Sequence, residues 1–439
     1  MRTILALAFF STFATAADPA DLARRADADL PRLESLYRHL HAHPELSFQE
    51  EKTAARIAAE LRSAGFEVAE RVGGHGVVGV LKNGPKNGTG RTVLVRTDLD
   101  ALPVKEETGL AFASLATGRD DAGTEVPIMH SCGHDVHMTV FCGVARLLAD
   151  LRGEWKGTLV LVAQPAEERG SGARRMLADG LYTRFPKPDF ALALHVNSEL
   201  PAGSVSVIEG FALANVDTMD LTIRGVGGHG AFPQGAKDPI VLAAQTVLAL
   251  QTIVSRETEP GQAAVVTVGS IHGGAKHNVI PDEVRLQLTL RSYTEEVRQN
   301  TIASIRRIAA GLAQAAGLPP GREPVIKISD GFTPATFNDP ALARKLEETF
   351  KRTLGAGALR PTRPVMGGED FSEYGRTSDK VPICIFWLGV VGEEAWKAHK
   401  DEKKPLPSLH SGFFKPDFRP AARTGVVAMA AAVLEVLGS

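Results

Sequence analysis

The sequence predicts an α/β protein whose larger domain is built on a mostly parallel sheet, with a smaller ferredoxin-like α+β domain inserted into it. Two patterns carry this prediction. Short, nearly continuous apolar runs alternate with helical segments, which is typical of buried parallel strands covered by helices on both faces. After about residue 213, apolar and polar side chains alternate within the strands, which is typical of antiparallel strands with one solvated face.

Three of the apolar runs lead directly into side chains that can bind a metal or move protons. The runs at residues 92–95, 158–162 and 190–194 are followed by Asp98 and Asp100, by Glu167 and Glu168, and by His195, respectively. In folds of this kind, ligands gather at the carboxyl ends of the parallel strands. We therefore expect these side chains to meet in one site.

The inserted block is expected to contain six elements in the order β-α-β-β-α-β, which is that of a ferredoxin-like domain. Its strands are predicted at residues 217–224, 264–268, 284–290 and 325–328, and its helices at 239–254 and 294–316. Outside the block, helices are expected at 21–64, interrupted near 43–48, and at 340–354, with a strand at 383–388. We assign residues 18–212 and 329–439 to the larger domain, which carries the catalytic and metal-binding residues discussed below, and residues 213–328 to the inserted domain.

Residues 1–17 have the pattern of a secretory signal peptide. Arg2 precedes the apolar stretch Ile4–Phe10, and Ala14-Thr15-Ala16 then offers a small-x-small cleavage site. The prediction is an exported protein, either periplasmic or secreted. No later stretch is expected to be long enough to span a membrane.

The composition excludes some other classes of protein. The formal net charge of −2 over 439 residues gives no electrostatic reason to expect a nucleic-acid partner. The three cysteines are too few to staple an exported chain of this length with disulfides. Cys142 and Cys384 lie in apolar patterns typical of a core, whereas Cys132 lies among histidines.

The segment His130–His137 concentrates side chains that bind metals. Cys132 and His134 can both bind a borderline-soft divalent ion, and Gly133 between them lets the backbone bend tightly. The further ligands that we expect are Glu168, His195 and His410. Two ions that share one bridging ligand need about this many donors and leave a position open for water. Zinc is the ion that we expect first, and manganese, cobalt and nickel are compatible with the same donors.

The adjacent glutamates are expected to divide the work. Because two neighbouring side chains on an extended turn cannot point the same way, Glu168 can bind metal while Glu167 faces the water and takes its proton. Asp100 is expected to hydrogen-bond a ligating imidazole and so fix its tautomer. Asp98 is left without a role.

The inserted block contributes residues of its own. Two glycine-rich loops present His229 and Asn278, which are the donors that we expect to face a developing oxyanion. Arg291, after a strand of this block, could hold a substrate carboxylate in a bidentate clasp.

Taken together, these residues resemble the M20 metallopeptidase/aminoacylase family, and within it the amidohydrolase branch of hippurate hydrolase-like, N-acyl-amino-acid and indole-acetyl-amino-acid hydrolases. The matching stretches follow the family's order from residue 41 to residue 413, and they are 41–50, 96–103, 132–137, 165–168, 194–196, 228–231, 278–282, 368–371 and 409–411. The resemblance implies a zinc-exopeptidase-like catalytic domain in which Cys132 replaces the bridging aspartate of the wider family. It also implies that the inserted domain is a lid that mediates homodimerisation, with His229 acting in the active site across the dimer.

The activity that the resemblance implies is hydrolysis of the amide bond of N-acyl amino acids, hippurate-like compounds among them, or of short peptides. A water activated by the metals and deprotonated by Glu167 would attack the carbonyl. Three alternatives stay open. They are a metallo-carboxypeptidase or dipeptidase of the same fold, a metal-free thiol hydrolase with Cys132 as nucleophile, and a catalytically silent protein that binds metal or peptide.

Overall fold

The computed structural model describes residues 18–84, 90–329 and 331–438, which form two compact units. Unit 1 comprises the described residues before Gly210 together with Asn338–Thr362 and those from Tyr374 onward. Unit 2 comprises Gly210–Phe337 and Arg363–Glu373. The predicted signal peptide lies outside the described residues. Unit 2 also takes in a short segment from much later in the chain than the block predicted at 213–328.

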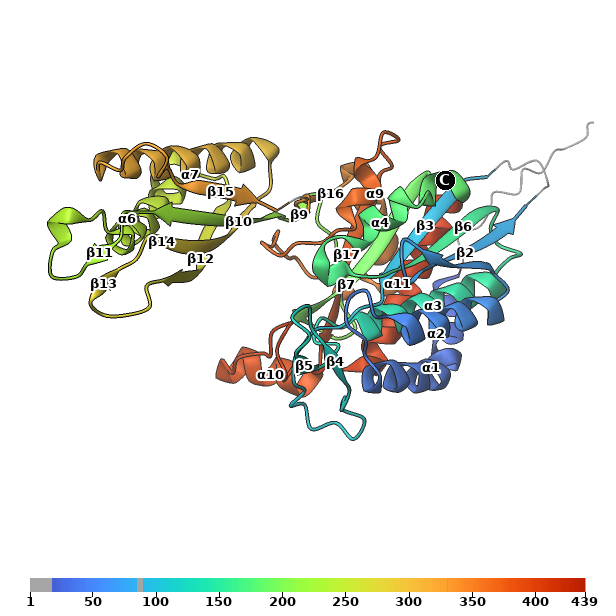
Figure 1. Cartoon of the computed structure of the whole chain (residues 1–439). Coiled ribbons are helices and arrows are strands. Elements are labelled where there is room, and N and C mark those ends of the chain that lie inside the picture. Colours follow the sequence, from blue (N-terminus) through green and yellow to red (C-terminus); the bar gives the residue numbers. More distant parts are fainter. Residues whose placement is uncertain (1–17, 85–89, 330, 439) are drawn as a thin grey trace, which may run out of the picture. The chain divides into compact units, whose positions relative to one another are not determined.

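Unit 1 is built on a seven-stranded sheet in the order β1-β2-β6-β3-β7-β17-β8. Strands β2, β6, β3, β7 and β17 of this sheet are labelled in Figure 1. The four neighbouring strands β6 (Gly157–Gln164), β3 (Thr92–Asp98), β7 (Phe190–Pro201) and β17 (Ile383–Val391) are parallel. The flanking strands β1 (Glu67–Val72), β2 (Gly76–Asn83) and β8 (Val205–Ser206) are antiparallel to their neighbours. Most residues of the parallel strands are buried, which is why they read as continuous apolar runs. The prediction of a mostly parallel sheet is confirmed.

The helices of unit 1 pack with this sheet around one large core. The core helices are α1 (Pro19–Ala42), α2 (Glu51–Ser63), α3 (His134–Asp150), α8 (Pro340–Leu354) and α11 (Phe418–Gly438). The remaining short elements of unit 1 are β4 (Thr117–Arg119), β5 (Glu125–Pro127), η1 (Glu167–Arg169), α4 (Gly172–Ala178), α5 (Leu181–Arg184), η4 (Ala356–Ala358) and α10 (Glu393–Glu402). Helix α9 (Ser372–Arg376) begins in the last residues of unit 2 and ends in unit 1. Helix α1 ends before, and helix α2 begins after, the break that the sequence predicts near residues 43–48.

Unit 2 has an antiparallel four-stranded sheet in the order β12-β14-β10-β15. Its main elements are β10 (Asn215–Arg224), α6 (Pro239–Thr252), β12 (Ala264–Gly273), β14 (Glu283–Ser292), α7 (Glu295–Ala315) and β15 (Val325–Ile328), and they follow the predicted β-α-β-β-α-β order. Helices α6 and α7 cover an apolar core formed by alternate residues of the strands, such as Leu221 and Leu286. The smaller elements are β9 (Gly210–Leu213), β11 (Gly228–His229), η2 (Pro233–Gly235), the π-helical turn η3 (Ile253–Glu257), β13 (Val279–Ile280) and β16 (Thr336–Asn338).

Two helices of the described chain are long and apolar enough to cross a membrane by length and composition alone, so the expectation that no such stretch would occur was wrong. They are Pro239–Glu257, which joins α6 to η3, and Phe418–Gly438, which is α11. The apolar window of α11 is 78% buried. Because α11 contacts α1, α3 and α8, its apolar surface on every side is explained by a position inside the core of unit 1.

Candidate metal centre

Unit 1 brings the five predicted metal ligands together. Cys132 Sγ lies 3.5 Å from His195 Nε2 and 3.2 Å from His410 Nε2. Glu168 Oε1 lies 3.8 Å from His134 Nε2 and 3.7 Å from His410 Nε2. These donors form two groups, Cys132 with His134 and His195, and Cys132 with Glu168 and His410. Cys132 is common to both groups, so its sulfur is placed where a ligand shared by two ions would be.

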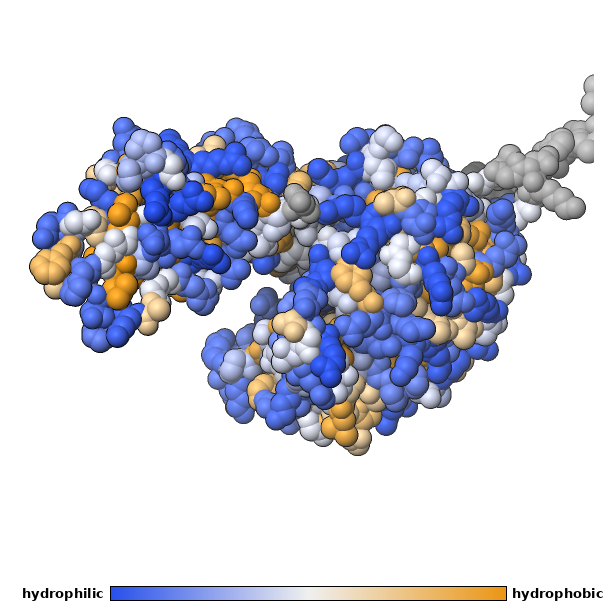
Figure 2. Space-filling model, viewed as in Figure 1, coloured by the Kyte–Doolittle hydropathy of each residue, from blue (hydrophilic) through white to orange (hydrophobic). Residues whose placement is uncertain are grey.

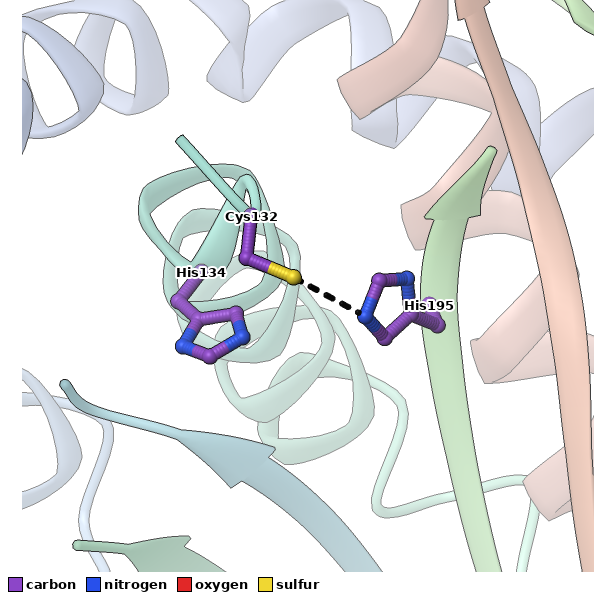
Figure 3. A group of neighbouring side chains, drawn as sticks. All are labelled: Cys132, His134 and His195. Carbon is purple, nitrogen blue, oxygen red and sulfur yellow. Dashed lines mark hydrogen bonds between the residues drawn. The ribbon is translucent and has the colours of Figure 1, made fainter. Parts of the chain in front are cut away.

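The backbone around Gly133 directs two of these side chains to the site. Gly133 is the N-cap of α3 and has φ +81°, a left-handed conformation that favours glycine. Cys132 precedes it in the turn, and His134 is the first residue of the helix (Figure 3). A Cβ atom at position 133 would lie 2.6 Å from Val196 Cγ2. Both the conformation and the close packing therefore require glycine here.

His195 comes from within β7, and the expectation that the strand would end at this residue was wrong. β7 continues to Pro201 because it stays paired with β17, where His195 is in register with Trp387. On its other side, β7 pairs with β3 only as far as Ala193. His195 thus lies just beyond the end of the β3 pairing. Its Nδ1 donates to the carbonyl of Val196 at 2.7 Å, which leaves Nε2 directed toward Cys132 (Figure 3).

Asp100 contacts the imidazole of His134, and its shorter contact is made by the main chain rather than by the side chain. His134 Nδ1 donates to the backbone carbonyl of Asp100 at 2.8 Å, while the Asp100 carboxylate oxygen Oδ1 lies 3.5 Å from that nitrogen. The main chain of Asp100 thus fixes the imidazole. The carboxylate accepts instead from the amides of Glu167 and Glu168, at 3.2 and 3.0 Å, and from the hydroxyl of Ser47 at 2.6 Å. The side chain of Asp100 therefore holds the turn that carries both glutamates.

Asp98, for which the sequence predicts no role, orients a histidine. Its Oδ1 accepts from His137 Nδ1 at 2.8 Å, and its Oδ2 accepts from Arg96 at 2.8 Å. His137 Nε2 in turn accepts from the amide of Val196 at 2.9 Å. Both ring nitrogens of His137 are engaged, so it holds the backbone next to His195 rather than acting as a free ligand.

His41, Asp135 and Glu106 form a buried triad beside the site, and neither His41 nor Glu106 has a role predicted from the sequence. His41 Nδ1 lies 2.6 Å from Asp135 Oδ2, and His41 Nε2 lies 3.0 Å from Glu106 Oε1. Burial lowers the pKa of His41, but the bonds to the two carboxylates outweigh it and raise this pKa to about 10. His41 is therefore a buried imidazolium. It ties α1 to the residue that follows His134. The signal in the sequence is a histidine on the apolar face of α1, next to Leu40.

The donor set fits divalent ions. His134 Nε2 and Glu168 Oε1 are buried and have no hydrogen-bond partner in the described part of the chain. Burial raises the pKa of the Cys132 thiol well above its usual range and raises that of Glu168 to about 7. Burial also lowers the pKa of His195 and of His410. Since a divalent ion favours thiolate, carboxylate and neutral imidazole together, it would satisfy the same atoms that burial leaves without a partner.

The same electrostatics argue against Cys132 as a nucleophile. Its side chain is buried, and the nearby carboxylates of Glu168 and Glu167 add to the effect of burial in raising the thiol pKa. Reactive cysteines instead have a lowered pKa and some access to solvent. The thiol-hydrolase alternative therefore loses support.

The three predicted residues of the inserted domain all lie in unit 2. His229 in β11 pairs with Val279 of β13, and the amide of Gly230 donates to the carbonyl of Asn278 at 2.9 Å. This brings the two glycine-rich loops together, with His229 and Asn278 both exposed. Arg291 in β14 is partly buried and donates to the carbonyl of Met366 at 2.7 Å. No carboxylate within the described ranges pairs with Arg291, and burial lowers its pKa.

The mostly parallel sheet, the two overlapping donor groups and the adjacent glutamate pair define a metal-dependent hydrolase. Comparison with known proteins identifies its family. Residues 94–413 match peptidase family M20/M25/M40, and the chain belongs to that family.

Individual relatives agree with this assignment. The chain is 36% identical to the N-acetylcysteine deacetylase of Bacillus subtilis over 366 residues, which cover 83% of this chain and 90% of the relative. It is 33% identical to thermostable carboxypeptidase 1 of Saccharolobus solfataricus over 381 residues, covering 85% and 91%. Among solved structures, the YXEP protein of Bacillus subtilis, a dinuclear metal binding peptidase from the M20 family, aligns with a TM-score of 0.73 and 30% identity, covering 93% of this chain and 99% of that one. The chain is thus a family M20 hydrolase that acts on C–N bonds, with the fold of a dinuclear metal-binding peptidase.

Proposed function

We propose that the protein is a two-metal amidohydrolase that removes the acyl group from N-acyl amino acids, with Glu167 as general base. One observation carries the proposal: Cys132 belongs to both donor groups, and Glu167 lies beside them, with its Oε2 3.9 Å from His134 Nε2. The likeness to the N-acetylcysteine deacetylase of Bacillus subtilis supports this class of substrate. The mixed S, N and O donors favour zinc, and manganese, cobalt and nickel are compatible with them.

In the proposed mechanism, five residues of the chain hold the metal ions and Glu167 transfers the proton. Cys132, His134, His195, Glu168 and His410 would hold the two ions. When bound, such ions polarise a carbonyl and lower the pKa of water toward neutrality. Glu167 then takes the proton of the attacking water and passes it to the leaving amine, which balances the reaction without a side-chain nucleophile. Asp100 keeps Glu167 in place by accepting its amide.

Unit 2 would supply substrate recognition. The partly buried guanidinium of Arg291, which no carboxylate in the described chain neutralises, suits the free carboxylate of an N-acyl amino acid. The exposed donors His229 and Asn278 suit a carbonyl oxygen that becomes negative as the tetrahedral species forms. A carboxypeptidase would need the same carboxylate clasp, and the name of the Saccharolobus relative keeps that activity as the second proposal.

Homodimerisation through unit 2 is part of the same proposal. Helix α6 contacts β12, which is an edge strand of its sheet. Both carry exposed large apolar side chains, with Val241 at 54%, Leu248 at 72% and Ile271 at 52% exposure. Apolar residues also reach the visible surface of unit 2 in Figure 2. An open strand edge beside exposed apolar side chains favours association with a second copy. Leu248→Lys should therefore shift the protein toward monomer in light scattering. Leu115→Lys in unit 1, at a leucine that is 93% exposed, is the matched control and should leave the mass unchanged.

We also propose that the enzyme is exported, on the sequence pattern of residues 1–17 alone. N-terminal sequencing of the protein recovered from cell fractions tests this. An uncleaved chain confined to the cytoplasm would contradict it.

The central experiment is a screen of N-acetyl and N-benzoyl amino acids and of dipeptides, with metal analysis on the same sample. Glu167→Gln should abolish turnover while the metal content stays that of the wild type, because the amide cannot accept the proton but leaves the five donors intact. A fully active Glu167→Gln variant would contradict the assignment of the base. A wild-type protein that binds metal but hydrolyses none of these compounds would favour the silent binding protein.

A further inference from the structure

Glu50 is a buried carboxylate that accepts a hydrogen bond from the backbone of Ala166 but has no part in the proposed mechanism. It lies at the start of α2 and has no exposed surface. Its Oε1 accepts from the amide of Ala166 at 2.8 Å. Its Oε2 is buried and has no hydrogen-bond partner in the residues that the structure describes. A buried carboxyl group that is only partly satisfied is unfavourable for folding, which directs attention to the bond that it does make.

Ala166 is the residue from which the Glu167–Glu168 turn starts. Its φ of +50° and ψ of +44° are left-handed, a conformation that a residue with a side chain rarely adopts. The next two amides, those of Glu167 and Glu168, are both accepted by Asp100. Three successive amides are thus held by two buried carboxyl groups, Glu50 and Asp100, that come from different parts of the chain. Strained backbone of this kind persists only where the surroundings hold it.

We propose that Glu50 is a positioning residue for Glu167: by accepting the amide of Ala166, it maintains the left-handed residue that aims the base at the site. The inference rests on the proposed function in so far as Glu167 is the base. Without the acceptor, the buried amide of Ala166 would lose its partner and the residue would relax from its unfavourable conformation. Because Glu167 follows directly, such a relaxation displaces its carboxylate, and small displacements of a catalytic group lower turnover strongly.

The geometry makes glutamine a close substitute for this glutamate. Burial, and then the charge of Asp100, raise the pKa of Glu50 to about 7, so a neutral side chain is compatible with the site. Glu50→Gln keeps an oxygen at the Oε1 position, whereas Glu50→Ala removes it and Glu50→Asp withdraws it by one methylene. Glu45 offers a matched control. It accepts from the amide and hydroxyl of Thr53, at 2.7 and 2.8 Å, in the same segment, but does not bond to the turn.

The test compares kcat, KM, bound metal and melting temperature for the four variants on whichever substrate the wild type hydrolyses. We expect Glu50→Ala and Glu50→Asp to lose at least tenfold in kcat with KM and metal content nearly unchanged. Glu50→Gln should recover most of the loss, and Glu45→Ala should lose melting temperature but not kcat. If Glu50→Ala does not fold, the contrast between Glu50→Asp and Glu50→Gln decides the question.

Three outcomes would overturn the proposal. In the first, Glu50→Ala or Glu50→Asp keeps the wild-type kcat. In the second, kcat falls in all four variants in step with melting temperature, which indicates a purely structural role. In the third, metal is lost from the Glu50 variants, which assigns the effect to Glu168 rather than to the base. Glu167→Gln separates this inference from the proposed function. If Glu167→Gln is active, the assignment of Glu167 as general base is wrong. If Glu167→Gln is inactive while Glu50→Ala is fully active, only the positioning role of Glu50 fails.

Discussion

Replacing Gly133 with alanine tests how the two proposed ligands on either side of it, Cys132 and His134, are held. At φ +81°, an L residue costs about 1–2 kcal/mol relative to the right-handed region. The added Cβ would also lie 2.6 Å from Val196 Cγ2 and 3.3 Å from Phe414 Cε1. Forcing one extra carbon into a packed core costs about 1–3 kcal/mol. The two contributions predict a loss of about 2–5 kcal/mol in the free energy of unfolding.

Gly123→Ala separates these two contributions. Gly123 has φ +78°, nearly that of Gly133, but no atom lies within 4 Å of the Cβ that alanine would add. This control should therefore lose only the conformational part, about 1–2 kcal/mol. Both variants belong to unit 1, and their urea unfolding curves should be compared after chelation, so that metal binding does not contribute.

The clash at position 133 has a second consequence for the site. Val196 directly follows His195, so pushing it away should also weaken metal binding in Gly133→Ala but not in Gly123→Ala. Equal unfolding midpoints for the two variants would refute the packing argument. A normal metal content in a strongly destabilised Gly133→Ala would refute its link to the ligands.

Three further predictions follow from the buried charges and the donor set. Chelation should lower the melting temperature as well as the activity. Ions that bind only the folded state stabilise it by about 4 kcal/mol when their concentration is a thousandfold above Kd. A melting temperature that does not change on dialysis against a chelator would contradict the metal site. Folding raises the pKa of His41 from 6.5 to about 10, so the charged imidazole contributes to the free energy of unfolding. This contribution should be complete below pH 6.5 and should disappear as the pH rises to 10. Urea midpoints of wild type and His41→Gln should therefore converge over that range, and a constant difference would count against the charged triad. Arg291→Leu should raise KM at least tenfold for N-acyl amino acids but not for their C-terminal amides, and an equal effect on both would remove the carboxylate clasp.

The larger part of the fold follows from patterns that short stretches of sequence carry. The parallel strands of unit 1 are buried on both faces, and the strands of unit 2 on one, so their apolar patterns differ in the predicted way. The extension of β7 beyond His195 could not be predicted in this way. It depends on pairing with β17, which lies almost two hundred residues later in the chain, and no local pattern encodes which neighbour a strand keeps. The end of the β3 pairing, not the end of β7, determines where His195 becomes available.

In the site as in the fold, the sequence predicts some features and not others. Cys132, His134, Glu168 and His195 are predicted as metal ligands because thiol, imidazole and carboxylate groups near strand ends or at a glycine turn suggest a metal from the residue types alone. Residue type also indicates Asp100, but not that its carbonyl makes the shorter contact with His134, at 2.8 Å against 3.5 Å for its carboxylate. A main-chain acceptor has no signature in the sequence, since every residue has a carbonyl group.

Three buried acids show why residue type suggests the proposed ligands but does not predict which residues hold them in place. Glu50, Asp98 and Asp100 are all buried and none belongs to the two donor groups that share Cys132. Each instead accepts hydrogen bonds from backbone amides or from an imidazole beside a ligand. An isolated buried carboxylate is expensive, so each of these acids is stable only where the surrounding chain already presents its donors. The donors in turn include the Glu167–Glu168 turn, which keeps its left-handed start only while the acids accept its amides. The turn and the acids therefore stabilise each other through contacts between distant segments, and the arrangement that aims Glu167 is specified by that packing rather than by any one stretch of sequence.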